Sequence, residues 1–114
     1  RAPQWLRDQL DPVAQLIAAS WLLSGPAELR EEAKRTLEAL TRGENRRVAQ
    51  LAEVQRWRTQ VVTADDREIA RWQAIIADIE PPLRAGGYHL LGQALLRQRR
   101  YQAAALALMR VPVI

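Results

Sequence analysis

Residues 85–110 read AGGYHLLGQALLRQRRYQAAALALMR, and this stretch decides the fold class. Alanine and leucine dominate it, as they dominate the whole chain with 19 and 16 copies, and both residues favour helices over strands. Prolines lie just before and just after the stretch, where they separate or end helices. We therefore predict a helix over residues 83–98, a bend at Arg99-Arg100 and a last helix over residues 101–110.

The helix-favouring composition extends toward the N-terminus. Residues 3–10 are predicted to form a short opening helix. Asp11 followed by Pro12 has the form of an N-cap with proline at the first helical position, so a second helix is predicted over residues 12–23. Almost all of its residues are apolar, and a helix without a polar face should be buried on several sides.

Three more helices are predicted in the middle of the chain. Residues 27–42 combine an apolar stripe with oppositely charged pairs, and Gly43 suits the position after the helix. Residues 46–62 are apolar over more than half the circumference, which is typical of a helix packed between neighbours. Residues 65–79 start at a capping aspartate and place their isoleucines on a single face. The prediction is an all-α chain of about six main helices, arranged as antiparallel hairpins.

Composition excludes several classes of function. The 114 residues include no cysteine, which excludes a thiol nucleophile, a thiolate zinc site and an iron–sulfur cluster. The longest apolar stretch is well short of the ~20 residues that a membrane span requires, so no membrane span is predicted. The length fits a single α-helical domain over residues 1–114, and we expect it to be a fragment of a longer protein. The sequence leaves the cellular compartment open.

Charge is distributed unevenly along the chain. The formal net charge is +4, yet residues 81–114 contain five arginines and no carboxylate. An anionic partner should therefore favour this segment. The candidate basic patch within it consists of Arg97, Arg99, Arg100 and Arg110.

The stretch quoted first resembles a tetratricopeptide repeat. In the 34-residue pattern of that family a large residue, a Leu-Gly pair, an aromatic residue and an alanine recur at fixed positions. Those positions are filled here by Tyr88, Leu91, Gly92, Tyr101 and Ala104. The resemblance implies that Gly92 and Ala104 form the close contact between the two helices of a repeat that covers residues 85–112.

One period earlier, residues 51–84 resemble the same repeat more weakly. Ala70 and Ala77 fill its small positions, whereas Arg58 stands where a small residue is expected. Residues 1–50 are assigned to helical hairpins of unassigned type, similar to either HEAT or tetratricopeptide repeats. The resemblance implies a short right-handed α-solenoid of stacked hairpins.

The concave surface of tetratricopeptide arrays implies a set of candidate partner-binding residues. They are Gln55, Thr59, His89, Gln93 and Arg97. None of them is acidic, so the implied partner is a protein or peptide segment of acidic character. The C-terminal end is apolar, and it implies a neighbouring repeat or a second copy of the chain. Its residues are Leu106, Leu108, Met109, Val111, Val113 and Ile114.

Residues with catalytic chemistry form no recognisable set. His89 is the only histidine and has no carboxylate three or four positions away, so neither a metal nor another cofactor is predicted. The adjacent acids Glu31-Glu32 point about 100° apart on a helix and are interpreted as surface charges. The four tryptophans, Trp5, Trp21, Trp57 and Trp72, are interpreted as core residues.

The sequence thus predicts a non-catalytic helical-repeat module. Its expected role is that of a scaffold or adaptor that mediates protein–protein interaction or assembly through a groove and through the open ends of a solenoid. The alternative is an arginine-rich nucleic-acid-binding module that uses the basic patch, for which affinity should be highest at low salt.

Overall fold

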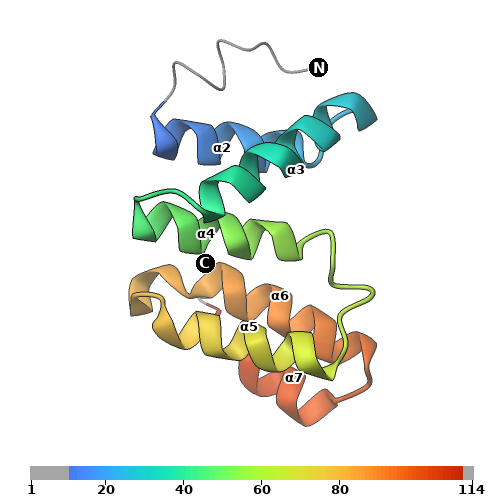
Figure 1. The fold of residues 1–114 in the computed structure, drawn as a ribbon. Helices are drawn as coiled ribbons and strands as arrows, with labels where there is room; N and C mark the ends of the chain where they lie inside the picture. The colour runs from blue at the N-terminus through green and yellow to red at the C-terminus, as the bar shows by residue number, and fades with distance from the viewer. Residues whose placement is uncertain (1–10, 112–114) are drawn as a thin grey trace. The chain divides into compact units, whose positions relative to one another are not determined.

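The computed structural model describes residues 11–111, and all regular structure in this range is helical. The predicted opening helix over residues 3–10 lies outside the described residues. The elements are α2 (Pro12–Leu22), α3 (Ala27–Thr41), α4 (Arg46–Trp57), α5 (Asp66–Asp78), the 3-10 turn η1 (Pro81–Leu83), α6 (Ala85–Arg97) and α7 (Tyr101–Leu108) (Figure 1). The all-α prediction is confirmed for this range, which contains six α-helices and no strand. Within it, no helix combines the length and the apolar character needed to cross a bilayer.

The chain divides into two compact units near the end of α4. The first unit comprises residues 1–56 and the second comprises residues 57–114. The first contains α2, α3 and almost all of α4, whereas the second contains Trp57, α5, η1, α6 and α7.

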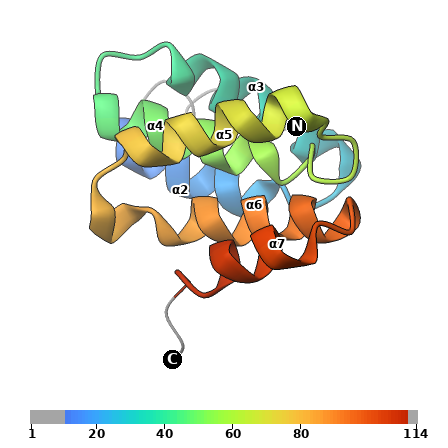
Figure 2. The ribbon, with the colours of Figure 1, turned by 90° about the horizontal axis from the view of Figure 1, so that it is seen from below.

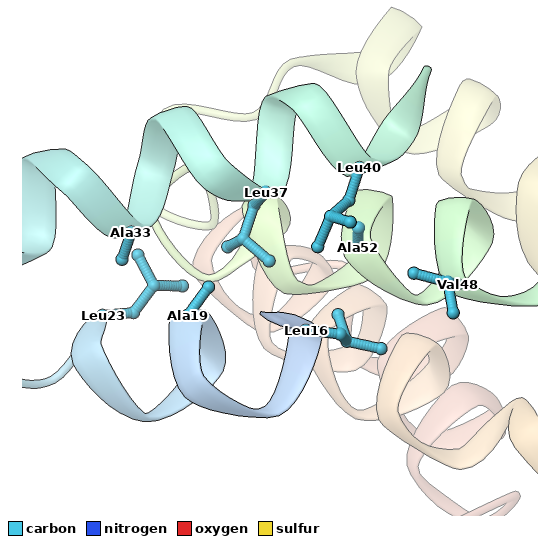
Figure 3. Packing of buried hydrophobic residues seen from close by; sticks show 8 residues of the cluster. All are labelled: Leu16, Ala19, Leu23, Ala33, Leu37, Leu40, Val48 and Ala52. Carbon is cyan, nitrogen blue, oxygen red and sulfur yellow. The ribbon is translucent and has the colours of Figure 1, made fainter. Parts of the chain in front are cut away.

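The first unit is built on the hairpin of α2 and α3. Asp11 caps α2, because its Oδ1 accepts a hydrogen bond from the Ala14 amide at 2.8 Å. Asn45 likewise accepts a hydrogen bond from the Val48 amide, at 3.2 Å, in the first turn of α4. The apolar sides of the three helices meet in one cluster (Figure 3). It consists of Leu16, Ala19, Leu23, Ala33, Leu37, Leu40, Val48 and Ala52.

Helix α2 differs from the prediction, which expected burial on several sides. Its buried side faces α3, its main neighbour. The opposite side is open to solvent, since Val13, Ile17 and Trp21 are 51%, 56% and 80% exposed. The assignment of Trp21 to the core was therefore wrong, because α3 is the one helix among those described that packs extensively against α2.

The second unit is centred on two stacked tryptophans. The rings of Trp57 and Trp72 have centroids 4.7 Å apart and planes inclined by 8°, and both side chains are fully buried. Helix α5 brings Trp72 to this stack together with the other residues of its apolar face. Of the predicted isoleucine face, Ile69, Ile76 and Ile79 are confirmed as buried, whereas Ile75 is half-buried.

Helix α5 begins with a capping box. The Asp65 carboxylate accepts a hydrogen bond from the Glu68 amide at 2.9 Å, and Glu68 Oε1 accepts one from the Asp65 amide at 3.4 Å. Both interactions are local, because cap and partner lie three residues apart. The start of this helix is therefore readable in the sequence.

Helix α4 ends at Trp57, whereas the prediction placed its end near residue 62. Residues 58–63 form turns, in which the Gln60 amide donates to the Trp57 carbonyl at 2.8 Å and the Thr63 amide donates to the Gln60 carbonyl at 3.1 Å. Four of these six residues are threonine or valine, whose β-branched side chains lose rotamer freedom in a helix. The first helix of the weaker repeat, over residues 51–84, thus stops part-way.

Helices α6 and α7 form a tight hairpin, and they lie side by side in both views (Figures 1 and 2). Gly92 lies where they cross, because a Cβ built on it would be 2.5 Å from Cδ2 and 2.6 Å from Cγ of Leu108. The expected close contact of Gly92 with Ala104 stays a prediction, since the atoms nearest to Gly92 belong to Leu108. Ala104 is buried, but the side chain that closes over Gly92 comes from Leu108, one turn further along α7.

A Schellman motif ends α6 and sets the turn into α7. The Arg100 amide donates to the Leu95 carbonyl at 3.0 Å, and the Arg99 amide donates to the Leu96 carbonyl at 2.9 Å. Arg99 has φ 60 and is the single non-glycine residue with positive φ among the described residues. Glycine is usual at this position because it lacks a Cβ, so an arginine here costs about 1 kcal/mol.

Replacing Arg99 with glycine should therefore stabilise the second unit by about 0.5–1 kcal/mol. The measurement is thermal unfolding followed by far-UV circular dichroism, in which the midpoint should rise by a few degrees. Arg100 has φ −89, so Arg100→Gly serves as the matched control and should give no gain. A lower midpoint for Arg99→Gly would contradict the left-handed conformation of Arg99.

Candidate interaction surface

Three of the predicted groove residues share one exposed face of α6. His89, Gln93 and Arg97 are spaced four residues apart, and all three are exposed. Gln93 Nε2 lies 3.1 Å from His89 Nε2, so the amide and the imidazole are hydrogen-bonded along the helix. This face is polar and carries no carboxylate.

The other two groove residues do not form an equivalent face. Gln55 is half-buried within α4 and belongs to the first unit, whereas Thr59 is exposed in the turns that follow Trp57. The prediction required both residues on one continuous helix. Because α4 ends before Thr59, that part of the prediction is wrong.

The predicted basic patch is smaller than its four arginines suggest. Arg110 Nη1 donates to Tyr88 Oη at 2.7 Å, and its guanidinium carbon lies 5.0 Å from the centroid of the Tyr88 ring. Arg100 forms an ion pair with Asp66 at 3.6 Å. Arg97 and Arg99 have no such partner among the described residues. The two arginines of the patch without such a contact therefore lie at the end of α6 and in the turn.

A fifth arginine of the basic segment has a structural role. Arg84 Nε donates to the Ile79 carbonyl at 2.7 Å, and its Nη2 donates to the Ala77 carbonyl at 2.9 Å. Both acceptors are carbonyls at the C-terminal end of α5, where a cation also interacts favourably with the helix dipole. Arg84 thus caps α5.

The residues assigned to repeat packing fall into two groups. Leu91, Gly92 and Ala104 are buried in the α6–α7 hairpin, and Tyr88 is half-buried beneath Arg110. The remaining three are exposed and do not serve the expected packing role. They are Ala70, Ala77 and Tyr101. For the two alanines the reason is that Ile69, Trp72 and Ile76 fix which side of α5 faces inward.

One face of α7 is apolar and open to solvent. The exposed fractions of Tyr101 and Leu106 are 62% and 60%. Met109, which directly follows the helix, is 79% exposed, and Ala105 is also exposed. Residues four apart share a helix face, so Tyr101, Ala105 and Met109 lie in line. Leu108, also expected at this apolar end, turns toward Gly92 instead. Val111 is half-buried, and Val113 and Ile114 lie outside the described residues.

A hollow lies in the first unit, at the side of α3 that carries Glu32. Its volume is about 240 Å³, and it is lined by Gln15, Glu32, Arg35, Thr36 and Ala39. Glu32 is buried, at 3% exposure, with its Oε1 3.8 Å from Arg35 Nη1. The prediction of two surface charges at Glu31-Glu32 was thus wrong for Glu32.

Glu31, by contrast, is a surface charge. Lys34 Nζ donates to Glu31 Oε2 at 3.0 Å, and this hydrogen bond, together with the positive charge, lowers the pKa of Glu31. Glu32 is the one carboxylate that lines the hollow, and the lining contains no histidine. Among residues 11–111, no three acidic or histidine side chains are grouped so that they could hold a metal ion.

Comparison with known proteins adds no relative. No protein-family model, no curated protein and no solved structure matches the chain. The resemblance of residues 85–112, and more weakly of residues 51–84, to a tetratricopeptide repeat therefore stays a prediction from the sequence.

Proposed function

We propose that the chain is a non-catalytic helical module that binds another protein segment through the exposed face of α7. The observation that carries the proposal is the exposure of Tyr101, Leu106 and Met109 on a helix whose other side is buried against α6. Apolar side chains gathered on one surface favour a protein partner, since burying them releases about 25 cal/mol per Å².

The geometry of the second unit supports a repeat-like role for this hairpin. The bounds of α6 and α7 fit the two helices of the repeat proposed for residues 85–112. Gln98 Nε2 donates to the Ala64 carbonyl at 2.9 Å, and these residues lie 34 positions apart, one period of the repeat. In a short α-solenoid the next element would cover α7. The scaffold function and the stacked-hairpin arrangement remain parts of this proposal.

The charge near this surface favours an acidic partner. Arg97 and Arg99 lie four and two residues before α7, residues 81–114 contain no acidic side chain, and the nearby Asp66 is paired with Arg100. The proposed ligand is therefore an amphipathic helix with an apolar face for α7 and acidic residues for the turn. The nucleic-acid alternative is less well supported, because Arg100 and Arg110 are already engaged within the chain.

The test is selection from a displayed library of random amphipathic peptides. Selected sequences should be rich in Asp and Glu, and the double variant Leu106→Glu, Met109→Glu should bind them at least about tenfold more weakly, since it loses apolar contacts and gains repulsion. Ala74→Glu, at an exposed site on α5, is the matched control and should bind like the parent chain.

Two results would contradict the proposal. One is equal binding of the selected peptides to the α7 double variant. The other combines two observations: no acidic peptides are selected, and the chain binds random-sequence RNA with an affinity that falls steeply as the salt concentration rises. This result would favour the nucleic-acid alternative.

A further inference from the structure

Helix α2 presents a second apolar surface, separate from the one on α7. Val13, Ile17 and Trp21, here called the α2 stripe, are all more than half exposed. They are spaced four residues apart and so lie in line along one side of the helix. The opposite side of α2 is occupied by the cluster of the first unit. Tryptophan is rarely left 80% exposed without a reason, because it buries the largest apolar area of any side chain.

The helix itself carries no charge. Pro12–Leu22 contains no Asp, Glu, Lys, Arg or His, so nothing along α2 repels a like surface. Its one hydroxyl, on Ser20, donates to the Leu16 carbonyl at 2.7 Å and can be desolvated with little loss. An apolar and uncharged helix of this kind is suited to a partner surface that is equally apolar and uncharged.

The α2 stripe is complementary to itself. Ile17 is at its centre, with Val13 four residues before it and Trp21 four residues after it. When two copies pair antiparallel about a two-fold axis at Ile17, the small Val13 of each copy meets the large Trp21 of the other. The helix dipoles also run in opposite directions, which is the favourable arrangement. A single helix thus supplies both halves of an isologous interface.

We infer that α2 is a homodimerisation surface, on which the α2 helix of a second copy packs antiparallel with Ile17 at the two-fold axis. The three side chains offer on the order of a few hundred Å² of apolar surface, like the largest patches of monomers. Two such stripes bury less than the ~1,200 Å² typical of stable interfaces, so we expect a weak dimer with a Kd of about 10 µM to 1 mM. This inference concerns the first unit and does not depend on the α7 surface.

Site-specific cross-linking tests the pairing, because the chain has no cysteine of its own. At about 0.5 mM protein, within the expected Kd range, Ile17→Cys should form a disulfide-linked dimer on mild oxidation. A mixture of Val13→Cys and Trp21→Cys should yield the mixed dimer, while each alone should cross-link little, because antiparallel pairing places identical residues about 12 Å or more apart. Ala70→Cys, exposed in the second unit, is the control for random collision.

Sedimentation equilibrium of the chain without cysteine gives an independent measurement. The parent chain should show a monomer–dimer equilibrium, and Ile17→Glu should weaken it at least about tenfold with an unchanged circular dichroism spectrum. Met109→Glu should leave the equilibrium in place.

Three outcomes overturn the inference. The first is that Ile17→Cys cross-links no faster than Ala70→Cys. The same result is expected if another part of the same chain shields α2, and it would overturn the inference in that case too. The second is that Val13→Cys and Trp21→Cys each cross-link efficiently alone, as parallel helices would. The third is that Met109→Glu, rather than Ile17→Glu, abolishes the dimer, which assigns pairing to the apolar C-terminal end.

Discussion

Trp72→Ala is expected to lower the free energy of unfolding of the second unit by about 3–5 kcal/mol, the usual cost of truncating a buried aromatic side chain. The Trp72 ring is fully buried and stacks on Trp57 at a centroid distance of 4.7 Å. Alanine removes the stacked ring and leaves a cavity beside Trp57. A loss of this size is a large part of the ~5–15 kcal/mol that stabilises an ordinary domain.

Urea unfolding followed by circular dichroism measures this loss, and Trp72→Phe is the informative control. Trp72 Nε1 is buried and has no hydrogen-bond partner within residues 11–111. Phenylalanine therefore keeps an aromatic ring in the stack and removes an unsatisfied donor, whose burial costs about 1–3 kcal/mol. Trp72→Phe should therefore cost less than half as much as Trp72→Ala. Equal losses for the two variants would show that the indole nitrogen is bonded after all.

Gly92→Leu is expected to destabilise the α6–α7 hairpin by about 1–3 kcal/mol through overpacking. Even the first carbon of a side chain at this position would lie 2.5 Å from Cδ2 of Leu108. The Leu108 side chain would have to leave its position or the helices would have to move apart at their crossing, although leucine has the higher helix propensity. The readout is the midpoint of thermal unfolding, which should fall.

A double variant separates overpacking from other causes. Leu108→Ala should itself be destabilising, but in combination with Gly92→Leu it makes room for the new side chain. The combined loss should therefore be smaller than the sum of the two single losses. An unchanged midpoint for Gly92→Leu alone would mean that Gly92 is not at the crossing and that the repeat-like assignment of this hairpin is wrong.

Local signals in the sequence predicted most helix starts. Asp11, Asn45 and Asp65 each cap a helix through a main-chain amide three residues away, so these signals depend on no distant contact. The end of α4 was missed, because the wide apolar surface of residues 46–62 outweighed the β-branched residues that follow Trp57. Helix ends marked only by a change in propensity are hard to place.

The candidate site was only partly predictable. The tetratricopeptide resemblance singled out His89, Gln93 and Arg97, and their four-residue spacing puts them on one helix face, because helical periodicity fixes which residues share a side. It did not show that Arg110 would lie against Tyr88, since these residues are 22 positions apart and meet only when α6 and α7 pair. The four-residue spacing of Val13, Ile17 and Trp21 on an uncharged helix was the overlooked signal of the α2 stripe.

Composition, helix caps and charge were enough to predict that this protein is helical, where most of its helices begin, and that its C-terminal segment is basic. Helix propensity, capping and charge depend on neighbouring residues, so they can be predicted from the sequence without knowledge of the fold. Which apolar residues are buried depends on how the helices pack and could not be predicted from neighbouring residues. Trp57 and Trp72 are fully buried whereas Trp21 is 80% exposed, because the burial of a side chain depends on which other helix packs over it.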